Sequence, residues 1–382
     1  MWAERFSRRL IFWMLPTVLV VAFGACRHSS ARSGGAERTT GAKSAESSSL
    51  REKIRRLDEG ALQFIEKLDG PGLLAYRKRT GITICGIHPI AVMLTVLKDS
   101  GLPVGVRVLD YYTSGDTTGD WTNTVSYYSI AFFSKNGVRR AHSSQGRVTP
   151  VSRTSAAEAG KGRGDVSASG HGKGADLPVR PMVTGPGWYP KNAPVLRRML
   201  HGFLNDAKVP ELGGPLLALI SPHAGYRFSG RAAAHGYKLL GLDKTVRRVV
   251  LLGVSHHVGF RGVSVGEFRA YQTPFGPLPL DEAAAQALRK HRGFGFLAKA
   301  HAQEHSLEMQ MPLLKLVQPG LRILPMLVGF VSAQQLDALA RPLVPLLDGA
   351  TVFVASSDFT HRGPRYGYQP FAGGVDTTVQ ER

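Results

Sequence analysis

Three apolar stretches of strand length in this sequence end directly in histidine or aspartate. I-S-P-H-A-G-Y puts His223 just past the first stretch, and L-L-G-V-S-H-H-V puts His256 and His257 past the second. V-F-V-A-S-S-D-F-T-H-R-G puts Asp358 and His361 past a later one. In open α/β sheets the ligand site lies beyond the carboxyl ends of the strands. Two imidazoles and a carboxylate suit a borderline divalent metal, so this spacing predicts a metal site.

A single histidine at a strand end is more often a structural hydrogen-bonding group, and the recurrence at three ends is what indicates a site. The segment E-H-S-L-E-M-Q-M-P is less clear. His305 and Glu308 would share one face of a helix. Ser306 next to a helix start is equally typical of an ordinary cap.

The elements that must position these groups alternate between strand and helix. Such alternation predicts an α/β fold with a mostly parallel central sheet flanked by helices. The expected strands are Leu216–Ser221, Val249–Ser255, Leu321–Val328 and Thr351–Ser356, and the expected helices are Pro194–Leu204, Gly230–Leu240, Leu280–Lys290, Ser306–Val317 and Ala333–Leu347.

A second globular stretch, residues 50–135, precedes this region. Apolar residues at steps of three and four from Leu50 to Leu68 predict a helix, which Gly70-Pro71-Gly72 would stop. Pro89–Leu97 predicts a buried helix, and Val104–Tyr112 and Val125–Phe133 predict strands. Between the helices lies Cys85, one of two cysteines in the chain. On residue type alone, Cys85 is best interpreted as a small buried core residue.

Residues 136–178 are mostly Ser, Gly, Ala, Arg and Lys and predict a flexible linker. They are not a phosphate-binding loop, because no strand precedes their glycines and no helix follows. Residues 179–382 are globular again. The sequence thus predicts two globular stretches joined by a linker.

The chain has 382 residues and a formal charge of +20, which raises the possibility of a nucleic-acid partner. Residues 1–50 and 136–180 supply +9 of that charge, and both stretches are poor in folding signals. Neither a basic helix with interleaved aromatics nor a zinc-finger spacing is present in the sequence. The sequence therefore predicts no nucleic-acid partner.

The N-terminal residues have the order of an export signal. Arg5, Arg8 and Arg9 precede the apolar run Leu10–Gly24, and Cys26 follows two small residues. F-G-A-C resembles a lipoprotein signal, which would make Cys26 a lipidation site, and S-R-R-L-I-F resembles a twin-arginine signal. An uncleaved anchor is the alternative. Residues 1–26 are thus predicted to be a signal and 27–49 a tether, in an exported, membrane-tethered protein of a bacterial cell envelope.

Several motifs together resemble the Memo family, which includes the protein B of the AmmeMemoRadiSam system. They are V-R-P-M-V-T-G-P-G-W-Y-P, S-P-H-A-G-Y-x-x-S-G, G-x-S-H-H-V, Y-x-T-P-F-G-x-L-P-L-D, E-H-S-L-E-M-Q-M-P and S-S-D-F-T-H-x-G, in this order. The resemblance implies a fold similar to the class III (LigB-like) extradiol dioxygenases.

The resemblance also implies a circular permutation. In Memo-like proteins the chain continues after S-S-D-F-x-H into a long helix, a T-I-C-G-x-H-P segment and a strand pair. Here the similar stretches are at residues 50–135, ahead of the rest. Residues 50–135 and 179–382 would then be the C-terminal third and the N-terminal two-thirds of one Memo-like domain, joined by 136–178. The alternative is a rearranged reading frame that does not fold, or two chains that complement each other by swapping.

The resemblance implies roles for five residues. His223 and His256 match two metal-binding histidines, and Cys85 stands where the extradiol dioxygenases have a carboxylate ligand. His361 matches an acid/base histidine, with Asp358 in the same vestibule. A thiolate ligand would favour copper(I), iron or zinc.

Two functions are compatible with this set of residues. One is a metal-dependent oxidoreductase acting on a small molecule such as a phenol. The other is a module that binds a peptide or a metal without turnover. The family also implies a radical-SAM enzyme as a partner.

Overall fold

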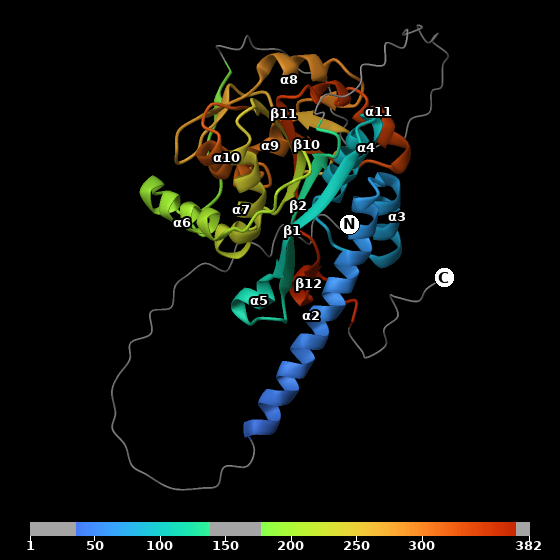
Figure 1. Ribbon diagram of the computed structural model, residues 1–382, viewed down its shortest axis with the longest axis vertical. Helices are drawn as coiled ribbons and strands as arrows, with labels where there is room; N and C mark the ends of the chain where they lie inside the picture. The colour runs from blue at the N-terminus through green and yellow to red at the C-terminus, as the bar shows by residue number, and fades with distance from the viewer. Residues whose placement is uncertain (1–35, 138–176, 372–382) are drawn as a thin grey trace. The chain divides into compact units, whose positions relative to one another are not determined.

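A nine-stranded mixed sheet forms the centre of the computed structural model, which describes residues 36–137 and 177–371 (Figure 1). Four neighbouring strands at its middle run parallel: β4 (Leu216–Ser221), β11 (Thr351–Ser356), β5 (Arg248–Val254) and β10 (Arg322–Val328). The remaining strands lie on either side of these four: β1 (Val104–Thr113), β2 (Thr124–Ser134), β6 (Val263–Val265), β9 (Phe294–Gly295) and β12 (His361–Arg362). The predicted α/β class with a mostly parallel core is confirmed.

Helices cover both faces of this sheet. One face packs against α2 (Ala36–Glu66), α3 (Gly70–Thr80), α4 (Ile87–Asp99), α8 (Glu282–Arg289) and α11 (Leu336–Ala340). The other packs against α6 (Ala193–Asp206), α7 (Tyr226–Leu242), α9 (Ala298–Ala302) and α10 (Met311–Val317). The short α5 (Ser114–Thr118) follows β1, and a small sheet contains β3 (Val179–Arg180), β7 (Ala270–Tyr271) and β8 (Leu278–Pro279).

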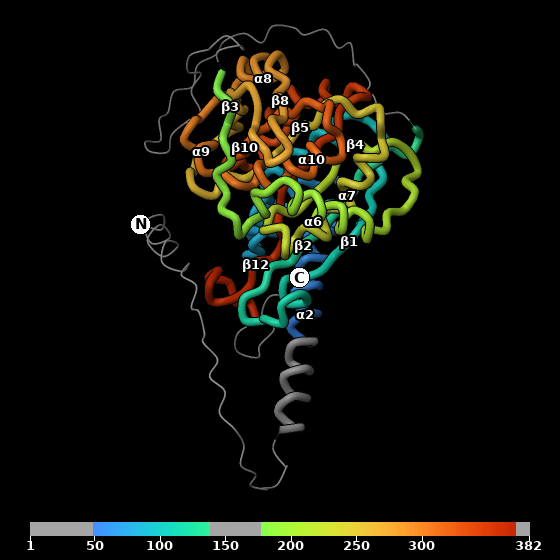
Figure 2. The backbone as a smooth tube through the Cα atoms, turned by 90° about the vertical axis from the view of Figure 1, so that its left-hand side faces the viewer, coloured from blue at the N-terminus to red at the C-terminus, as the bar shows by residue number. Residues whose placement is uncertain are grey.

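Strand β2 joins the first globular stretch to the second. It pairs antiparallel with β4, with Ile130 opposite Ile220, and β1 pairs with β2 on the outer side (Figure 2). Helix α4 packs against β5, β10 and β11, so its buried side chains share one hydrophobic cluster with the parallel strands. Residues 50–137 and 177–371 therefore form one core. The predicted linker, apart from its ends, lies outside the described residues.

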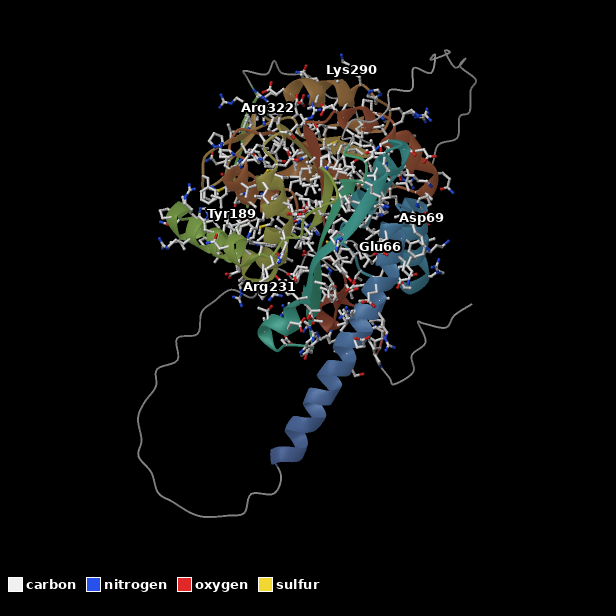
Figure 3. The ribbon with its side chains drawn as sticks, viewed as in Figure 1. Glu66, Asp69, Tyr189, Arg231, Lys290 and Arg322 are labelled. Carbon is white, nitrogen blue, oxygen red and sulfur yellow. The ribbon has the colours of Figure 1, made fainter. Side chains whose placement is uncertain are left out.

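Several predicted elements differ from those observed. Helix α2 begins at Ala36, so a helix occupies part of the stretch predicted to be a tether. Gly70, Pro71 and Gly72 are the first three residues of α3, whereas the sequence predicts only that they end the preceding helix. Asp69, which is labelled in Figure 3, caps α3. Its carboxylate accepts a hydrogen bond from the Gly72 N–H, and Pro71 occupies the first turn, where a missing N–H costs nothing.

The predicted helix Ala333–Leu347 is broken into short pieces. These are a 3₁₀ turn at Ala333–Gln335, α11, and a second 3₁₀ turn at Val344–Leu346. Pro342 and Pro345 explain the break, because neither can donate a backbone hydrogen bond within a helix.

The predicted membrane anchor is not supported by the structure. Within the described ranges, no helix is both long enough and apolar enough to cross a membrane. Cys26 and the rest of the predicted signal lie outside the described residues. The apolar run Leu10–Gly24 is also shorter than the roughly 20 residues that a spanning helix needs.

Candidate metal centre

Cys85, His223 and His256 come together at the carboxyl ends of the parallel strands. One ligand atom from each lies within 4.8 Å of the corresponding atoms of the other two. Cys85 Sγ is 3.2 Å from His223 Nε2. Ligand atoms around a tetrahedral ion with bonds of about 2.0–2.3 Å lie roughly 3.3–3.8 Å apart. The three residues therefore fit around one transition-metal ion with little movement.

The position of Cys85 depends on the start of α4. Cys85 immediately precedes Gly86, the N-cap of that helix, so its sulfur lies near the positive end of the helix dipole. Gly86 passes so close to β11 that a Cβ would lie 2.5 Å from the Ser356 carbonyl oxygen. Only glycine allows this approach. The sulfur also accepts a hydrogen bond from the backbone N–H of Asp358 at 3.3 Å.

Glu304 orients the second histidine. Its carboxylate accepts one hydrogen bond from His256 Nδ1 at 2.8 Å and another from the His256 backbone N–H at 2.6 Å. It accepts a third from the Ser306 N–H, and its side chain is buried. Because Nδ1 donates to this carboxylate, Nε2 of His256 is left as the possible metal ligand.

Asp358 is hydrogen-bonded to the loop that follows β4. Its Oδ1 accepts hydrogen bonds from the backbone N–H groups of His223 at 2.8 Å and Ala224 at 3.3 Å. Its Oδ2 lies 3.9 Å from His223 Nε2. The carboxylate thus positions the His223 backbone and stands beside the candidate ligands.

His361 lies beside the same sulfur. Cys85, Asp358 and His361 form a second group whose possible ligand atoms lie within 4.8 Å of one another. His361 Nδ1 is 2.8 Å from the Phe359 carbonyl oxygen and 3.1 Å from that of Thr83. Carbonyl oxygens only accept, so Nδ1 is protonated and Nε2 of the neutral ring can exchange a proton.

The charges of the centre are strongly coupled. Burial by itself would raise the pKa of the Cys85 thiol, but the neighbouring His223 and His256 rings lower that pKa to about 5. Burial would lower the pKa of His256, but its hydrogen bonds to Cys85 and Glu304 raise it to about 10. The sulfur therefore has thiolate character at neutral pH, which metal coordination requires.

Sequence reasoning missed the roles of His305 and Glu308. The His305 ring stacks on His256 at a centroid distance of 4.3 Å and packs against Trp188 at 4.4 Å. Glu308 is buried and accepts hydrogen bonds from Arg180, Val183, Thr184 and Tyr189. Glu308 precedes the regular turns of α10, within a 3₁₀ turn, and binds the segment after β3 instead of sharing a helix face with His305.

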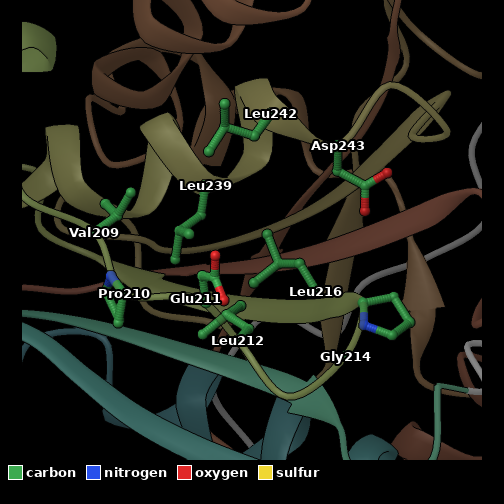
Figure 4. A pocket seen from close by; sticks show the side chains of 10 residues that line it. Val209, Pro210, Glu211, Leu212, Gly214, Leu216, Leu239, Leu242 and Asp243 are labelled. Atoms are coloured by element: carbon green, nitrogen blue, oxygen red, sulfur yellow. The ribbon is translucent and has the colours of Figure 1, made fainter.

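A separate hollow of about 420 Å³ lies away from this centre (Figure 4). Its lining includes Val209, Leu212, Leu239 and Leu242. It contains none of the candidate ligands.

Comparison with known proteins gives the family. The family described as Memo-like protein matches residues 2–131 and 180–382. A Protein memo-1 homolog of Caenorhabditis elegans is 36% identical over 188 residues, covering 48% of this chain and 53% of the relative. A MEMO1 family protein of Methanopyrus kandleri is 36% identical over 196 residues, covering 48% of this chain and 69% of the relative. A MEMO1 family protein of Saccharomyces cerevisiae is 31% identical over 228 residues, covering 54% of this chain and 67% of the relative. The chain spans about half to two-thirds of the length of these relatives.

These findings also correct the predicted localisation. These three relatives, and a fourth from Schizosaccharomyces pombe, are eukaryotic and archaeal proteins named as memo-1 or MEMO1 family members. Together with the lack of a membrane-spanning helix in the described ranges, they contradict an exported, membrane-tethered lipoprotein, and that prediction is wrong. An order of basic, apolar and small residues is a short compositional pattern and by itself is weak evidence for where a protein is located. The motifs around the candidate metal centre and the match over both globular stretches agree instead on one assignment: the chain belongs to the Memo family.

Proposed function

We propose that this protein binds one transition-metal ion through Cys85, His223 and His256 and acts as a metal-dependent oxidoreductase on a small molecule. The observation behind the proposal is the convergence of three ligand atoms within 4.8 Å from segments far apart in the chain. A thiolate and two neutral imidazoles form a donor set for copper(I), iron or zinc, and three protein ligands leave a position open. The ion would supply a Lewis acid or redox centre for the substrate at that position.

The residues around the ligands have roles of their own in this proposal. Glu304 holds His256 with Nε2 toward the sulfur, and Asp358 holds the backbone of His223. His361 is anchored through Nδ1 to two carbonyl oxygens, which leaves Nε2 to take up or release a substrate proton. Iron or copper would support redox chemistry, whereas zinc would support only polarisation of the substrate.

The test is the metal content of protein purified without oxygen, measured by mass spectrometry before and after addition of Fe²⁺, Cu⁺ or Zn²⁺. About one ion per chain is expected, together with oxygen uptake when a catechol is added to the iron or copper form. Failure to bind any of the three ions would overturn the proposal. Binding without oxygen uptake would favour the alternative, a module that binds a metal or a peptide without turnover.

We also propose that the order of the chain is circularly permuted within the family. Two separate stretches match one family, and the stretch between them, residues 132–179, does not. The antiparallel pairing of β2 with β4 and the packing of α4 on the central strands support a single domain. In addition, Lys53 of α2 lies over the ring of Phe371, 5.7 Å from its centroid, so the two ends of the described core meet.

A further inference from the structure

A buried network of hydrogen bonds determines which nitrogen of His223 carries its proton. His223 Nδ1 lies 2.9 Å from Ser356 Oγ, on the side of the ring opposite Cys85. Either atom could be the donor in this contact. The other partners of Ser356 decide the question, because a hydroxyl has one proton and two lone pairs.

The orientation of the Gln310 amide can be established first. One end of this amide faces the Pro222 carbonyl oxygen at 2.9 Å and Ser356 Oγ at 2.8 Å, and the other end faces the hydroxyl of Tyr237 at 2.7 Å. A carbonyl oxygen only accepts, so the end that faces Pro222 must be the NH₂ group. Gln310 therefore donates to Ser356 and accepts from Tyr237.

The proton of Ser356 is then accounted for. Its hydroxyl lies 2.6 Å from the Ser306 carbonyl oxygen, which can only accept, so Ser356 donates its one proton there. One lone pair of the hydroxyl receives the Gln310 amide proton. The only role left toward His223 is acceptance, so His223 Nδ1 must be the donor. Nε2 consequently presents its lone pair toward Cys85 whenever the ring is neutral.

We propose that Ser356, whose hydroxyl is oriented by the Ser306 carbonyl and by Gln310, is a positioning residue that fixes His223 as the Nδ1–H tautomer and thereby prepares Nε2 to bind a metal. The inference rests on the proposed metal site but concerns the metal-free protein as well. Ser356 and Gln310 are fully buried, so water cannot replace either partner. The two histidines are thus held differently, His256 by a carboxylate and His223 by a neutral hydroxyl.

The test compares Ser356→Ala with Ser129→Ala. Ser129 is also a fully buried strand serine, and its hydroxyl has no hydrogen-bond partner among the described residues. Zn²⁺ affinity should fall about 10- to 100-fold in Ser356→Ala and stay near that of the wild type in Ser129→Ala. Gln310→Met frees one lone pair of the Ser356 hydroxyl but leaves its proton with the Ser306 carbonyl, so His223 Nδ1 still donates and only a small loss of affinity is expected. If Ser356→Ala does not fold, the tautomer measured in the wild type decides the inference.

Nitrogen-15 NMR of the metal-free protein, at a pH where the His223 ring is neutral, gives a readout independent of metal. The wild type should show a protonated Nδ1, and Ser356→Ala should show a mixture of both tautomers. A wild-type Nε2–H tautomer would overturn the inference, as would equal Zn²⁺ affinities in the two alanine variants. If the wild type binds no Zn²⁺, Fe²⁺ or Cu⁺, the proposed function fails, and the NMR result still decides the tautomer.

Discussion

Cys85 Sγ lies 3.2 Å from His223 Nε2, although 138 positions separate the two residues in the chain. The contact exists because α4 packs on the parallel strands and brings Cys85, just before the helix, to the carboxyl end of β4.

Removal of the Cys85 or the His223 side chain should abolish metal binding. Cys85→Ala and His223→Ala are each expected to retain less than about a tenth of an ion per chain after addition of Zn²⁺, since two ligands rarely hold it. His257→Ala, at an exposed position next to His256, is the control and should bind like the wild type.

His361 should matter for turnover and not for binding of the ion. Its Nδ1 is occupied by two carbonyl oxygens, and it is not one of the three proposed ligands. His361→Ala should keep its metal content but lower the rate of any oxidation of catechols by about 10²- to 10⁴-fold, the usual contribution of a general acid or base. Loss of metal together with activity would assign His361 to the ligands instead.

Glu304 should tune the metal affinity through His256. Glu304→Gln keeps the size of the side chain but removes its charge and presents an NH₂ group to one of the N–H donors that now face it. Affinity for Zn²⁺ should fall about 10- to 100-fold, as is typical when the partner of a ligating histidine is changed. Glu267→Gln is the matched control, because Glu267 is also buried but pairs with Arg289 outside the centre. A calorimetric titration of both variants checks the prediction, and equal affinities would contradict it.

Asp58 should make stability depend on pH. Its buried carboxylate accepts hydrogen bonds from Tyr111 and Thr360. Burial outweighs these bonds and raises its pKa from 3.8 to about 6. The folded state therefore binds the proton more tightly than the unfolded state does. The contribution of Asp58 to stability is complete below pH 4 and is lost as the pH rises to 6.

Urea unfolding of the wild type and of Asp58→Asn at several pH values measures this contribution. The wild-type free energy of unfolding, relative to the variant, should decrease by about 2 kcal/mol between pH 4 and pH 6. The variant removes the titrating group, and all other carboxyl groups are common to both proteins. A constant difference across this range would show that Asp58 has an ordinary pKa.

The two matched stretches should remain together when the chain between them is cut. We suggest inserting a protease recognition sequence at about residue 160 and cleaving the purified protein. The fragments should elute together from a sizing column and separate only in denaturant, because β2 and β4 share backbone hydrogen bonds and α4 packs on the central strands. Separation under native conditions would indicate two independent domains and contradict the proposed permutation.

The central part of the fold could be predicted from sequence because its strands are uniformly apolar. The predicted bounds of β4 and β11 agree with those observed, and those of β5 and β10 differ by at most one residue at each end. The start of α3 was missed because Pro and Gly end one helix and begin the next within the same three residues. Local periodicity does not distinguish these roles; they depend on whether a residue such as Asp69 caps the following turn.

The residues of the candidate site also fall into those that local sequence could predict and those that it could not. The proximity of His223, His256 and Asp358 could be predicted from their position at strand ends, whereas their roles toward a metal ion stay a prediction. Cys85 could not, because nothing in its local sequence distinguishes a ligand from a core thiol; only the resemblance to the family suggested it. Ser356 and Gln310 gave no signal, since buried hydroxyls and amides are common, and their roles depend on contacts between distant segments.

The long separation between Cys85 and Asp358 also has a consequence during synthesis. These two residues are in contact although 273 positions separate them in the chain. Strand β11, which Asp358 follows, must therefore be made before the contact can form. At about 5–20 residues per second, a ribosome would need roughly 15–55 s to make the chain between them. During that interval the Cys85 thiol lacks the backbone N–H of Asp358, even after His223 and His256 have been made, so the centre can assemble fully only once the chain has been synthesised as far as Asp358.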